Sequence, residues 1–301
     1  MFDRCPTLAR AGILSSPPAA VAAIELRELD SGGPAALHAG CGSLHDRPMP
    51  SSQPNTQQLI SVSPTAISFD FWHTLVAEPE GLLERLRKEA VIHALIAHQI
   101  GIEEGLLDAR LAAAQALQAD AWIRGEHLGP THVAAYLADT IEGLEGSSHK
   151  SVVDAYLGAG KSVDLELSPG AASTLTTLAG NDMQLGIICD VGLTGSEYLR
   201  AILKRAAVMH YFRGWAFSDE IGHYKPSTEI FSCMLDQFDL ASGDVVWHVG
   251  DRRRTDVAGA RSSGFVPIRY RGITDDTSDG PEADLVIDDL AELIPLIRDL
   301  S

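Results

Sequence analysis

Two short apolar runs, each ending in an aspartate, decide the fold of this chain: Ala66-Ile67-Ser68-Phe69-Asp70 and Val245-Val246-Trp247-His248-Val249-Gly250-Asp251. Such runs are typical of buried strands in a parallel sheet, which gathers the carboxyl ends of its strands at one edge. Two carboxylates about 4 Å apart would repel each other by ~4 kcal/mol at an effective dielectric of about 20. A hard divalent ion such as Mg²⁺ removes that repulsion. The sequence therefore predicts a parallel sheet with a cation site at its edge.

Helix and strand patterns alternate from residue 169 to the end of the chain. Strands are predicted over 185–189, 214–217, 245–249, 266–270 and 285–287, and helices over 171–178, 196–207, 227–238, 254–263 and 290–300. This alternation predicts an α/β fold with a doubly wound parallel sheet and helices on both faces. Right-handed crossovers would place the loops that follow the strands at the same edge of the sheet.

Residues 79–165 carry a different pattern, because apolar side chains recur there near a 3.6-residue period, as in Leu82, Leu83 and Leu86. We expect an all-helical domain over 79–165, with helices that include 132–141 and 151–157. It would be inserted into an α/β core domain formed by 63–78 and 166–301. Proline and glycine near residues 78–81 and 169–170 suit hinges at the two junctions.

Residues 1–62 are rich in proline, serine, glycine and alanine, as in Ser15-Ser16-Pro17-Pro18. A segment of this composition buries little apolar surface per residue, so we predict a disordered Pro/Ser-rich extension, with a short helix over 19–29. Both a docking or regulatory tail and a dispensable extension fit this composition.

Four segments in the predicted core carry polar side chains in a recognisable order and spacing. They are Phe69-Asp70-Phe71-Trp72-His73-Thr74-Leu75, Leu185–Asp190, Phe217–Pro226 and His248–Ala260. Together these segments resemble the four motifs of the haloacid dehalogenase (HAD) superfamily of hydrolases, over about residues 64–300. The resemblance implies a Rossmann-like core, a helical cap inserted between the first and second motifs, and a small phosphorylated substrate.

The resemblance also implies catalytic roles. Asp70 would be the nucleophile that forms an aspartyl-phosphate, since a carboxylate can attack phosphorus. Lys225 would neutralise the nucleophile and the transferring phosphoryl group. Thr74 would donate a hydrogen bond that orients Asp70 or would open the next helical turn; threonine is also common in such turns for structural reasons alone.

The expected cofactor is Mg²⁺. Asp70 and Asp251 would be direct ligands, and the backbone carbonyl of Trp72 would be a third ligand by family analogy. Asp256 would support the ion through water or orient its loop, and as a helix N-terminal aspartate it would also suit the helix dipole. Gly250 would let the backbone turn tightly near the ion.

Two of the motifs depart from the family pattern. Trp72 stands where phosphatases of the family usually carry an aspartate as general acid and base, and a tryptophan cannot fill that role; its loss typically costs about 10²- to 10⁴-fold in rate. His73 follows, where glycine is usual. In the second motif Cys189 replaces the serine or threonine that holds a phosphate oxygen.

Phosphate binding would therefore fall partly to other groups. The thiol of Cys189 is a weaker hydrogen-bond donor than a hydroxyl. Asp190, Thr194 or backbone amides at the following helix start could compensate for it. Lys225 would contribute charge, and Arg252 would bind an anionic substrate or balance charge near Asp251.

Composition limits the partners and the compartment. A net charge of -18 argues against nucleic acid and anionic membrane surfaces as partners, and no apolar run reaches the length of a membrane span. The four cysteines, Cys5, Cys41, Cys189 and Cys233, show no paired spacing. They predict reduced thiols in a cytoplasmic protein. The sequence does not indicate an oligomeric state.

Three functions remain open at this point. The first is a Mg²⁺-dependent hydrolase that acts on a phosphate ester, with activity reduced by Trp72. The second is a catalytically degenerate relative that binds a phosphorylated ligand or a protein. The third is carbon–halogen hydrolysis, a reaction whose enzymes also lack the second aspartate but use no metal. Trp122, Arg124, His127 and Tyr136 are candidates for substrate selection by the cap.

Overall fold

A computed structural model of the chain describes residues 61–161 and 163–300. The predicted helix over 19–29, and all of the predicted N-terminal extension except Ser61 and Val62, lie outside the described residues.

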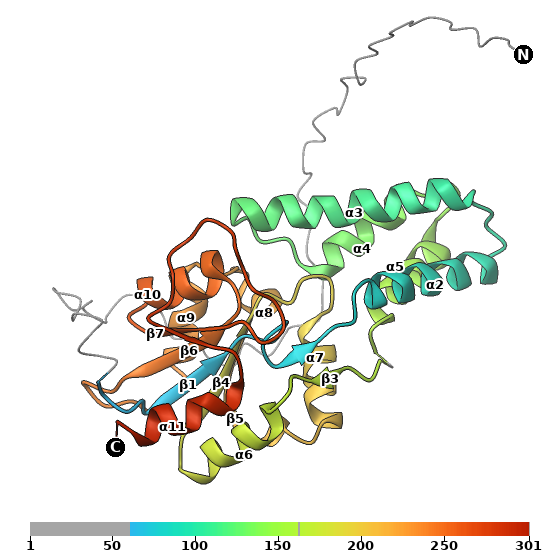
Figure 1. Ribbon diagram of the computed structural model, residues 1–301. Coiled ribbons are helices and arrows are strands. Elements are labelled where there is room, and N and C mark those ends of the chain that lie inside the picture. Colours follow the sequence, from blue (N-terminus) through green and yellow to red (C-terminus); the bar gives the residue numbers. More distant parts are fainter. Residues whose placement is uncertain (1–60, 162, 301) are drawn as a thin grey trace, which may run out of the picture. The chain divides into compact units, whose positions relative to one another are not determined.

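The main sheet has six parallel strands in the order β5-β4-β1-β6-β7-β8 (Figure 1). The strands are β1 (Ala66–Phe69), β4 (Gln184–Cys189), β5 (Phe212–Phe217), β6 (Val246–Gly250), β7 (Val266–Tyr270) and β8 (Leu285–Ile287). Strand β1 pairs with both β4 and β6, so that Phe69 lies between Ile187 and Val249. The strands that precede Asp70 and Asp251 are therefore neighbours at the centre of the sheet, and the predicted parallel sheet is confirmed.

Helices pack on both faces of this sheet. Ile67 and Phe69 of β1 belong to a buried cluster with α6 (Ala171–Gly180), α7 (Ser196–Arg205) and α11 (Leu293–Arg298). Ala66, which points the opposite way along the strand, belongs to a second cluster with α9 (Thr228–Leu235) and α10 (Ala258–Ser262). Since successive side chains of a strand point to opposite faces, these two clusters are the two interior layers of a doubly wound fold.

The remaining core elements are short. The turns η1 (Met209–Tyr211) and η3 (Leu290–Glu292) are 3₁₀ helices, and α8 (Ser218–Ile221) follows β5 directly. The helix predicted over 254–263 forms as two pieces, a π-helical turn η2 (Arg253–Val257) and then α10. The helix predicted from residue 227 begins one residue later, with Ser227 as its N-cap.

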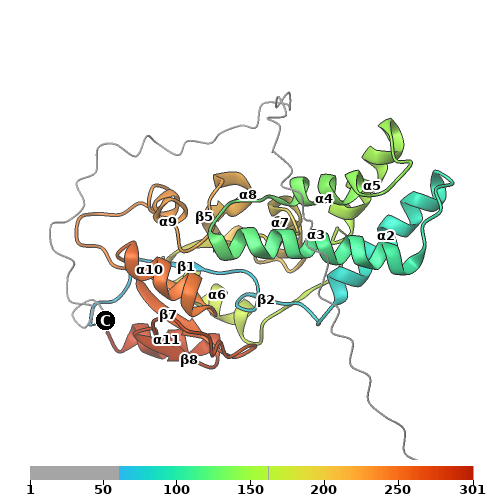
Figure 2. The ribbon, with the colours of Figure 1, turned by 90° about the horizontal axis from the view of Figure 1, so that it is seen from above.

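Four helices lie between the first and second strands of the main sheet in sequence. They are α2 (Leu82–Ala97), α3 (Glu104–Arg124), α4 (Pro130–Asp139) and α5 (Gly146–Gly158) (Figure 2). Side chains from all four helices share a hydrophobic cluster of their own. The chain enters and leaves this helical segment through a two-stranded antiparallel sheet, β2 (Val76–Ala77) and β3 (Glu166–Leu167). Sequence reasoning missed this pair, because two residues are too short to show a strand period.

Candidate active site

The charged residues of the first, third and fourth motifs meet at the carboxyl edge of the sheet. Asp70 follows β1, Asp251 follows β6, and Asp256 lies in η2. The Lys225 Nζ lies 2.5 Å from Asp70 Oδ1 and 2.6 Å from Asp256 Oδ1. All four side chains are buried. The structure thus brings together the four residues that the sequence predicted at this edge.

Oxygens of Asp70, Asp251 and Asp256 all lie within 4.8 Å of one another. Burial, opposed by Lys225, raises the pKa of Asp70 to about 7. Burial together with the charges of Asp256 and Asp70 raises the pKa of Asp251 to about 8. Although burial also acts on Asp256, Lys225 and His248 hold its pKa below the usual range. With all three carboxylates ionised, the cluster would carry more negative charge than Lys225 alone neutralises, and a bound cation would favour that ionised state.

The donor set fits a hard cation such as Mg²⁺. Both oxygens of Asp256 are engaged, since Oδ1 accepts from Lys225 and His248 and Oδ2 accepts from the Arg252 backbone N–H at 2.9 Å. Asp251 Oδ2 is buried and has no hydrogen-bond partner in the described part of the chain. Asp70 and Asp251 are therefore the better placed direct ligands, with Asp256 behind them. Trp72 lines the same cavity, and the ligand role of its carbonyl stays a prediction.

Gly250 leaves room for Asp256. A Cβ atom added at Gly250 would lie 2.3 Å from the Asp256 carboxyl carbon, so any side chain there would displace that carboxylate. The backbone φ of Gly250 is not in the left-handed region. The reason for the glycine is thus the close approach of Asp256, whereas the sequence suggested a tight turn near the ion.

Two buried polar residues that were not predicted from the sequence support Asp256, His248 directly and Ser68 through His248. His248 Nε2 lies 3.0 Å from Asp256 Oδ1, and His248 Nδ1 lies 2.9 Å from Ser68 Oγ. Because Nε2 faces a carboxylate oxygen, the neutral histidine donates its proton to Asp256 and accepts from Ser68. Both residues are polar positions inside otherwise apolar strand runs, which is the sequence signal that could have found them.

The second motif contributes differently from its prediction. Cys189 is fully buried in the hydrophobic core and does not line the cavity, and burial raises the pKa of its thiol. A phosphate contact by Cys189 therefore has no support from the geometry. Asp190 does line the cavity, but its Oδ1 accepts from the Lys225 backbone N–H at 2.9 Å and its Oδ2 accepts from Trp122 Nε1 at 2.8 Å. Asp190 thus joins the second motif, the third motif and the helical segment.

The loop after Asp70 also differs from expectation. The Thr74 hydroxyl is buried and finds no hydrogen-bond partner among residues 61–161 and 163–300, and the chain continues into β2 instead of a helix. Thr74 does not line the cavity. His73 adopts a left-handed backbone with φ of 58°, a conformation that glycine adopts most easily. That geometry explains why glycine is usual at this position in the family motif.

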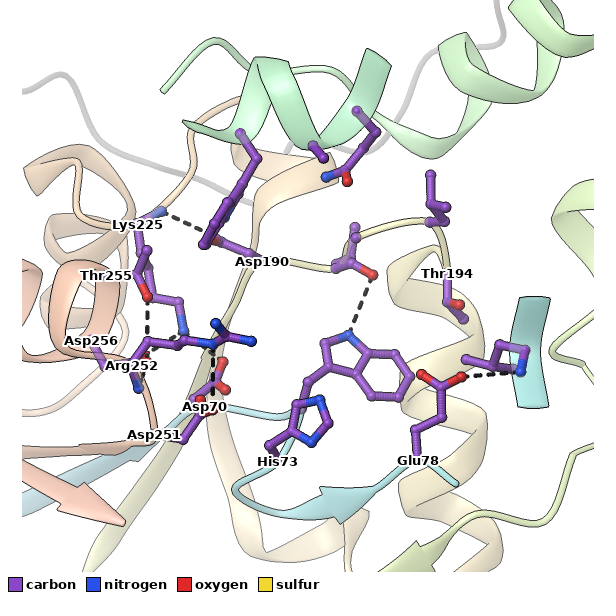
Figure 3. A pocket seen from close by; sticks show the side chains of 18 of the residues that line it. Asp70, His73, Glu78, Asp190, Thr194, Lys225, Asp251, Arg252, Thr255 and Asp256 are labelled. Carbon is purple, nitrogen blue, oxygen red and sulfur yellow. Dashed lines mark hydrogen bonds and ion pairs between the residues drawn. The ribbon is translucent and has the colours of Figure 1, made fainter. Parts of the chain in front are cut away.

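A cavity of about 360 Å³ opens over these residues, with walls from both the sheet edge and the helical segment (Figure 3). The helical segment supplies Arg87, Gln118 and Trp122. The Trp122 ring lies 3.9 Å from the Arg254 guanidinium, in addition to its bond to Asp190. Trp122 thus links the helical segment to both the second and the fourth motif.

The other suggested selectivity residues lie elsewhere. Arg124 pairs with Glu126, His127 lines a separate cavity, and Tyr136 packs against the helical core. Arg252 does line the main cavity, with its Nε 3.5 Å from Asp251 Oδ2. The place of Arg87 in the cavity was not predicted, because the sequence pattern of an amphipathic helix does not distinguish a buried arginine from an exposed one.

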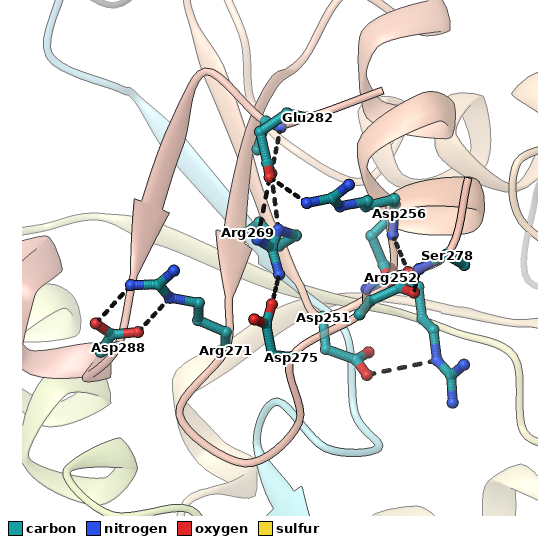
Figure 4. Close-up of polar contacts among 12 residues, drawn as sticks. Asp251, Arg252, Asp256, Arg269, Arg271, Asp275, Ser278, Glu282 and Asp288 are labelled. Atoms are coloured by element: carbon teal, nitrogen blue, oxygen red, sulfur yellow. Dashed lines mark hydrogen bonds and ion pairs between the residues drawn. The ribbon is translucent and has the colours of Figure 1, made fainter. Parts of the chain in front are cut away.

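Ion pairs fasten the loop after β7 against the Asp251 loop (Figure 4). The Arg253 backbone N–H donates to Asp276 Oδ2 at 2.7 Å, and the Arg253 side chain pairs with Glu282. Glu282 in turn pairs with the buried Arg269 of β7, which also binds Asp275. These contacts fix the backbone next to Asp251 and Arg252.

The described residues add two observations on location. No helix in them is long and apolar enough to cross a membrane. Cys189 and Cys233 are both buried. A cytoplasmic location stays a prediction.

Residues 125–268 match the family model of the haloacid dehalogenase-like hydrolases. The fold is similar to that of a 2-haloacid dehalogenase from Pseudomonas syringae pv. Tomato DC3000, with a TM-score of 0.58 and 19% identity over 79% of this chain and 100% of that one. No curated protein matches the sequence.

Two further solved structures are similar. A HAD phosphatase from Thermococcus onnurineus has a TM-score of 0.53 and 20% identity, over 77% of this chain and 97% of that one. A candidate HAD-hydrolase bound to magnesium, YfnB from Bacillus subtilis, has a TM-score of 0.55 and 16% identity, over 78% and 99%. At such identities the likeness is one of fold.

Proposed function

Because the chain is a haloacid dehalogenase-like hydrolase, we propose that it cleaves a small phosphate ester with the help of Mg²⁺. One observation carries this proposal: Lys225 lies between Asp70 and Asp256, while the neighbouring buried Asp251 keeps one oxygen without a hydrogen bond. A nucleophile, a fixed cation and a second acidic ligand thus face one cavity.

In the proposed reaction the Asp70 carboxylate attacks phosphorus, the P–O bond of the ester breaks, and the alcohol leaves with a proton taken from water. Water then hydrolyses the aspartyl-phosphate, which releases phosphate and restores the Asp70 carboxylate. Lys225 holds the orientation of Asp70 and offsets charge on the transferring phosphoryl group. Asp70 and Asp251 would hold Mg²⁺, which supplies further charge neutralisation when bound. Asp256, fixed by His248, keeps Lys225 in place. The helical segment would act as the cap that closes the cavity.

Trp72 bears on how fast this reaction runs. Its indole N–H lies 3.4 Å from the Val191 carbonyl, and an indole cannot protonate a leaving group at neutral pH. We therefore propose a slow phosphatase, or one specialised for good leaving groups. The same observation favours a second candidate, a degenerate relative that binds phosphorylated ligands with little turnover.

The test uses the purified full chain with p-nitrophenyl phosphate and a panel of phosphorylated metabolites, each with Mg²⁺ and with EDTA. We expect metal-dependent turnover that Asp70→Asn lowers by about 10⁴-fold. Asp182→Asn, at an exposed position, is the matched control and should retain activity. Metal binding without turnover would favour the degenerate relative, and metal-independent halide release would favour carbon–halogen hydrolysis.

A further inference from the structure

Three cations line the main cavity, and they differ in their partners. Lys225 contacts two carboxylates, and Arg252 lies 3.5 Å from the carboxylate of Asp251. Arg87 of α2 has no carboxylate within ion-pair distance in the described part of the chain. Of these three cations, Arg87 is thus the one that makes no close ion pair within the described residues.

Arg87 is also buried, with 7% of its surface exposed. Its guanidinium donates to Thr194 Oγ1 at 2.7 Å and lies over the Tyr156 ring at 5.7 Å from the centroid. Glu78 lines the same cavity, and its charge and that of Glu84 act on Arg87 from beyond ion-pair distance. The Oε1 of Glu78 accepts from the Leu83 backbone N–H. An arginine buried without a carboxylate is costly, because desolvation of its charge is not offset by an ion pair.

The position of Arg87 separates it from the reacting groups. It comes from the helical segment, whereas Asp70, Lys225 and Asp251 come from the sheet edge, and the two sets line one cavity of about 360 Å³. One ligand of small size can therefore reach both sets. The guanidinium spends one nitrogen on Thr194, which leaves further N–H groups for a carboxylate or phosphate, the anions whose geometry it matches.

We propose that Arg87 binds a second anionic group of the substrate, a carboxylate or another phosphate, while the ester to be cleaved lies at Asp70. This inference rests on the proposed function and narrows its substrate to small phosphate esters with two anionic ends. Thr194 takes up one N–H of the guanidinium and the Tyr156 ring lies beside it, and the substrate supplies a close counter-ion.

Matched substrates test this proposal. n-Propyl phosphate and 3-(phosphonooxy)propanoate differ by a carboxylate in place of a methyl group, and propane-1,3-diyl bisphosphate adds a second phosphate instead. The wild type should prefer at least one of the two doubly anionic esters over n-propyl phosphate by about 10- to 100-fold in kcat/KM. Whichever ester is preferred identifies the second anion.

Variants assign the preference to Arg87. Arg87→Met should remove the preference, and Arg87→Lys should retain part of it, because an ammonium keeps the charge without the fork. Thr194→Val removes the hydroxyl to which Arg87 donates and should retain most of the preference. Circular dichroism checks the folding of each variant. If Arg87→Met does not fold, a partial preference in Arg87→Lys supports the proposal, and a preference equal to that of the wild type overturns it. A wild type without preference, or a preference that survives in both Arg87 variants, overturns the proposal.

Two other outcomes are informative. If Thr194→Val loses the preference as fully as Arg87→Met, Arg87 only ties two segments together and the proposal is overturned. If no ester is hydrolysed, the proposed function fails on its own, and calorimetry of 3-phosphonopropanoate against propylphosphonate on the Asp70→Asn chain still tests Arg87. Tighter binding of the acid, abolished by adding Arg87→Met, supports the anion site, and equal binding of the two probes refutes it.

Discussion

The cavity has two walls that differ in how their charges are arranged. At the sheet edge, Asp70, Lys225 and Asp256 are joined by contacts of 2.5–2.6 Å and supported by His248. On the helical wall, Arg87 is buried without a carboxylate partner among the described residues. Catalysis needs reacting groups that are held in a fixed geometry. A charged side chain without an ion-pair partner can instead select a substrate of opposite charge. The difference therefore separates where the reaction is catalysed from where the substrate is chosen.

The largest expected effect breaks the sheet-edge wall. Lys225→Met removes the cation between Asp70 and Asp256 and leaves both carboxylates buried without it. We expect turnover to fall by about 10³-fold, and the free energy of unfolding in EDTA to fall by about 3 kcal/mol. Steady-state kinetics and urea denaturation measure the two effects.

The matched control for this variant is Lys204→Met, which changes an exposed lysine of α7. It should alter neither quantity. Full stability in the Lys225→Met chain would show that the contacts at the sheet edge do not hold the carboxylates together.

A second change sharpens the comparison by adding the acid that the sheet-edge wall lacks. Trp72→Asp would restore a carboxyl group at the general acid position, so turnover of n-propyl phosphate should rise by about 10²-fold. Aryl phosphates, whose leaving groups need less protonation, should gain less. Trp72→Asn makes a cavity of similar size without an acid, and an equal gain in that variant would rule out proton transfer as the cause.

The smallest expected effect concerns the link between the two walls. Trp122→Phe keeps an aromatic ring for Arg254 but removes the N–H that bonds to Asp190. We expect KM to rise by about 5-fold with a smaller change in kcat. Ile123→Ala, on the same helix at a side chain 65% exposed, should leave both constants as they are. A change confined to kcat would place Trp122 in the reaction instead of the link.

Much of the sheet edge could be predicted from the sequence. Apolar runs identified β1 and β6, and a parallel sheet gathers the ends of its strands, and hence Asp70 and Asp251, at one edge. The direct pairing of the two strands was seen only in the structure. The position of Lys225 was predicted from its motif. The burial of Cys189 was not predicted, because a strand period does not tell which side chain at the end of a strand turns into the core and which faces the cavity.

The helical wall could not be predicted in the same way. A 3.6-residue period identified the helices, but it says only which side chains are apolar. Arg87 faces a cavity that also includes residues over 100 positions away, such as Thr194, with which it makes a hydrogen bond that spans 107 residues. Of the four residues suggested for substrate selection by the cap, only Trp122 lines the cavity. Contacts of this kind depend on how two packed segments meet, which no local pattern records.

The central claim is that Asp70 and Asp251 hold one divalent cation beside Lys225. Crystals of the chain grown with Mn²⁺, an anomalous scatterer that accepts the same oxygen ligands as Mg²⁺, test it directly. The account predicts one anomalous peak within about 2.2 Å of an oxygen from each of these two aspartates, and its loss in Asp251→Asn but not in the exposed control Asp236→Asn. A peak elsewhere, or none at saturating Mn²⁺, would contradict it.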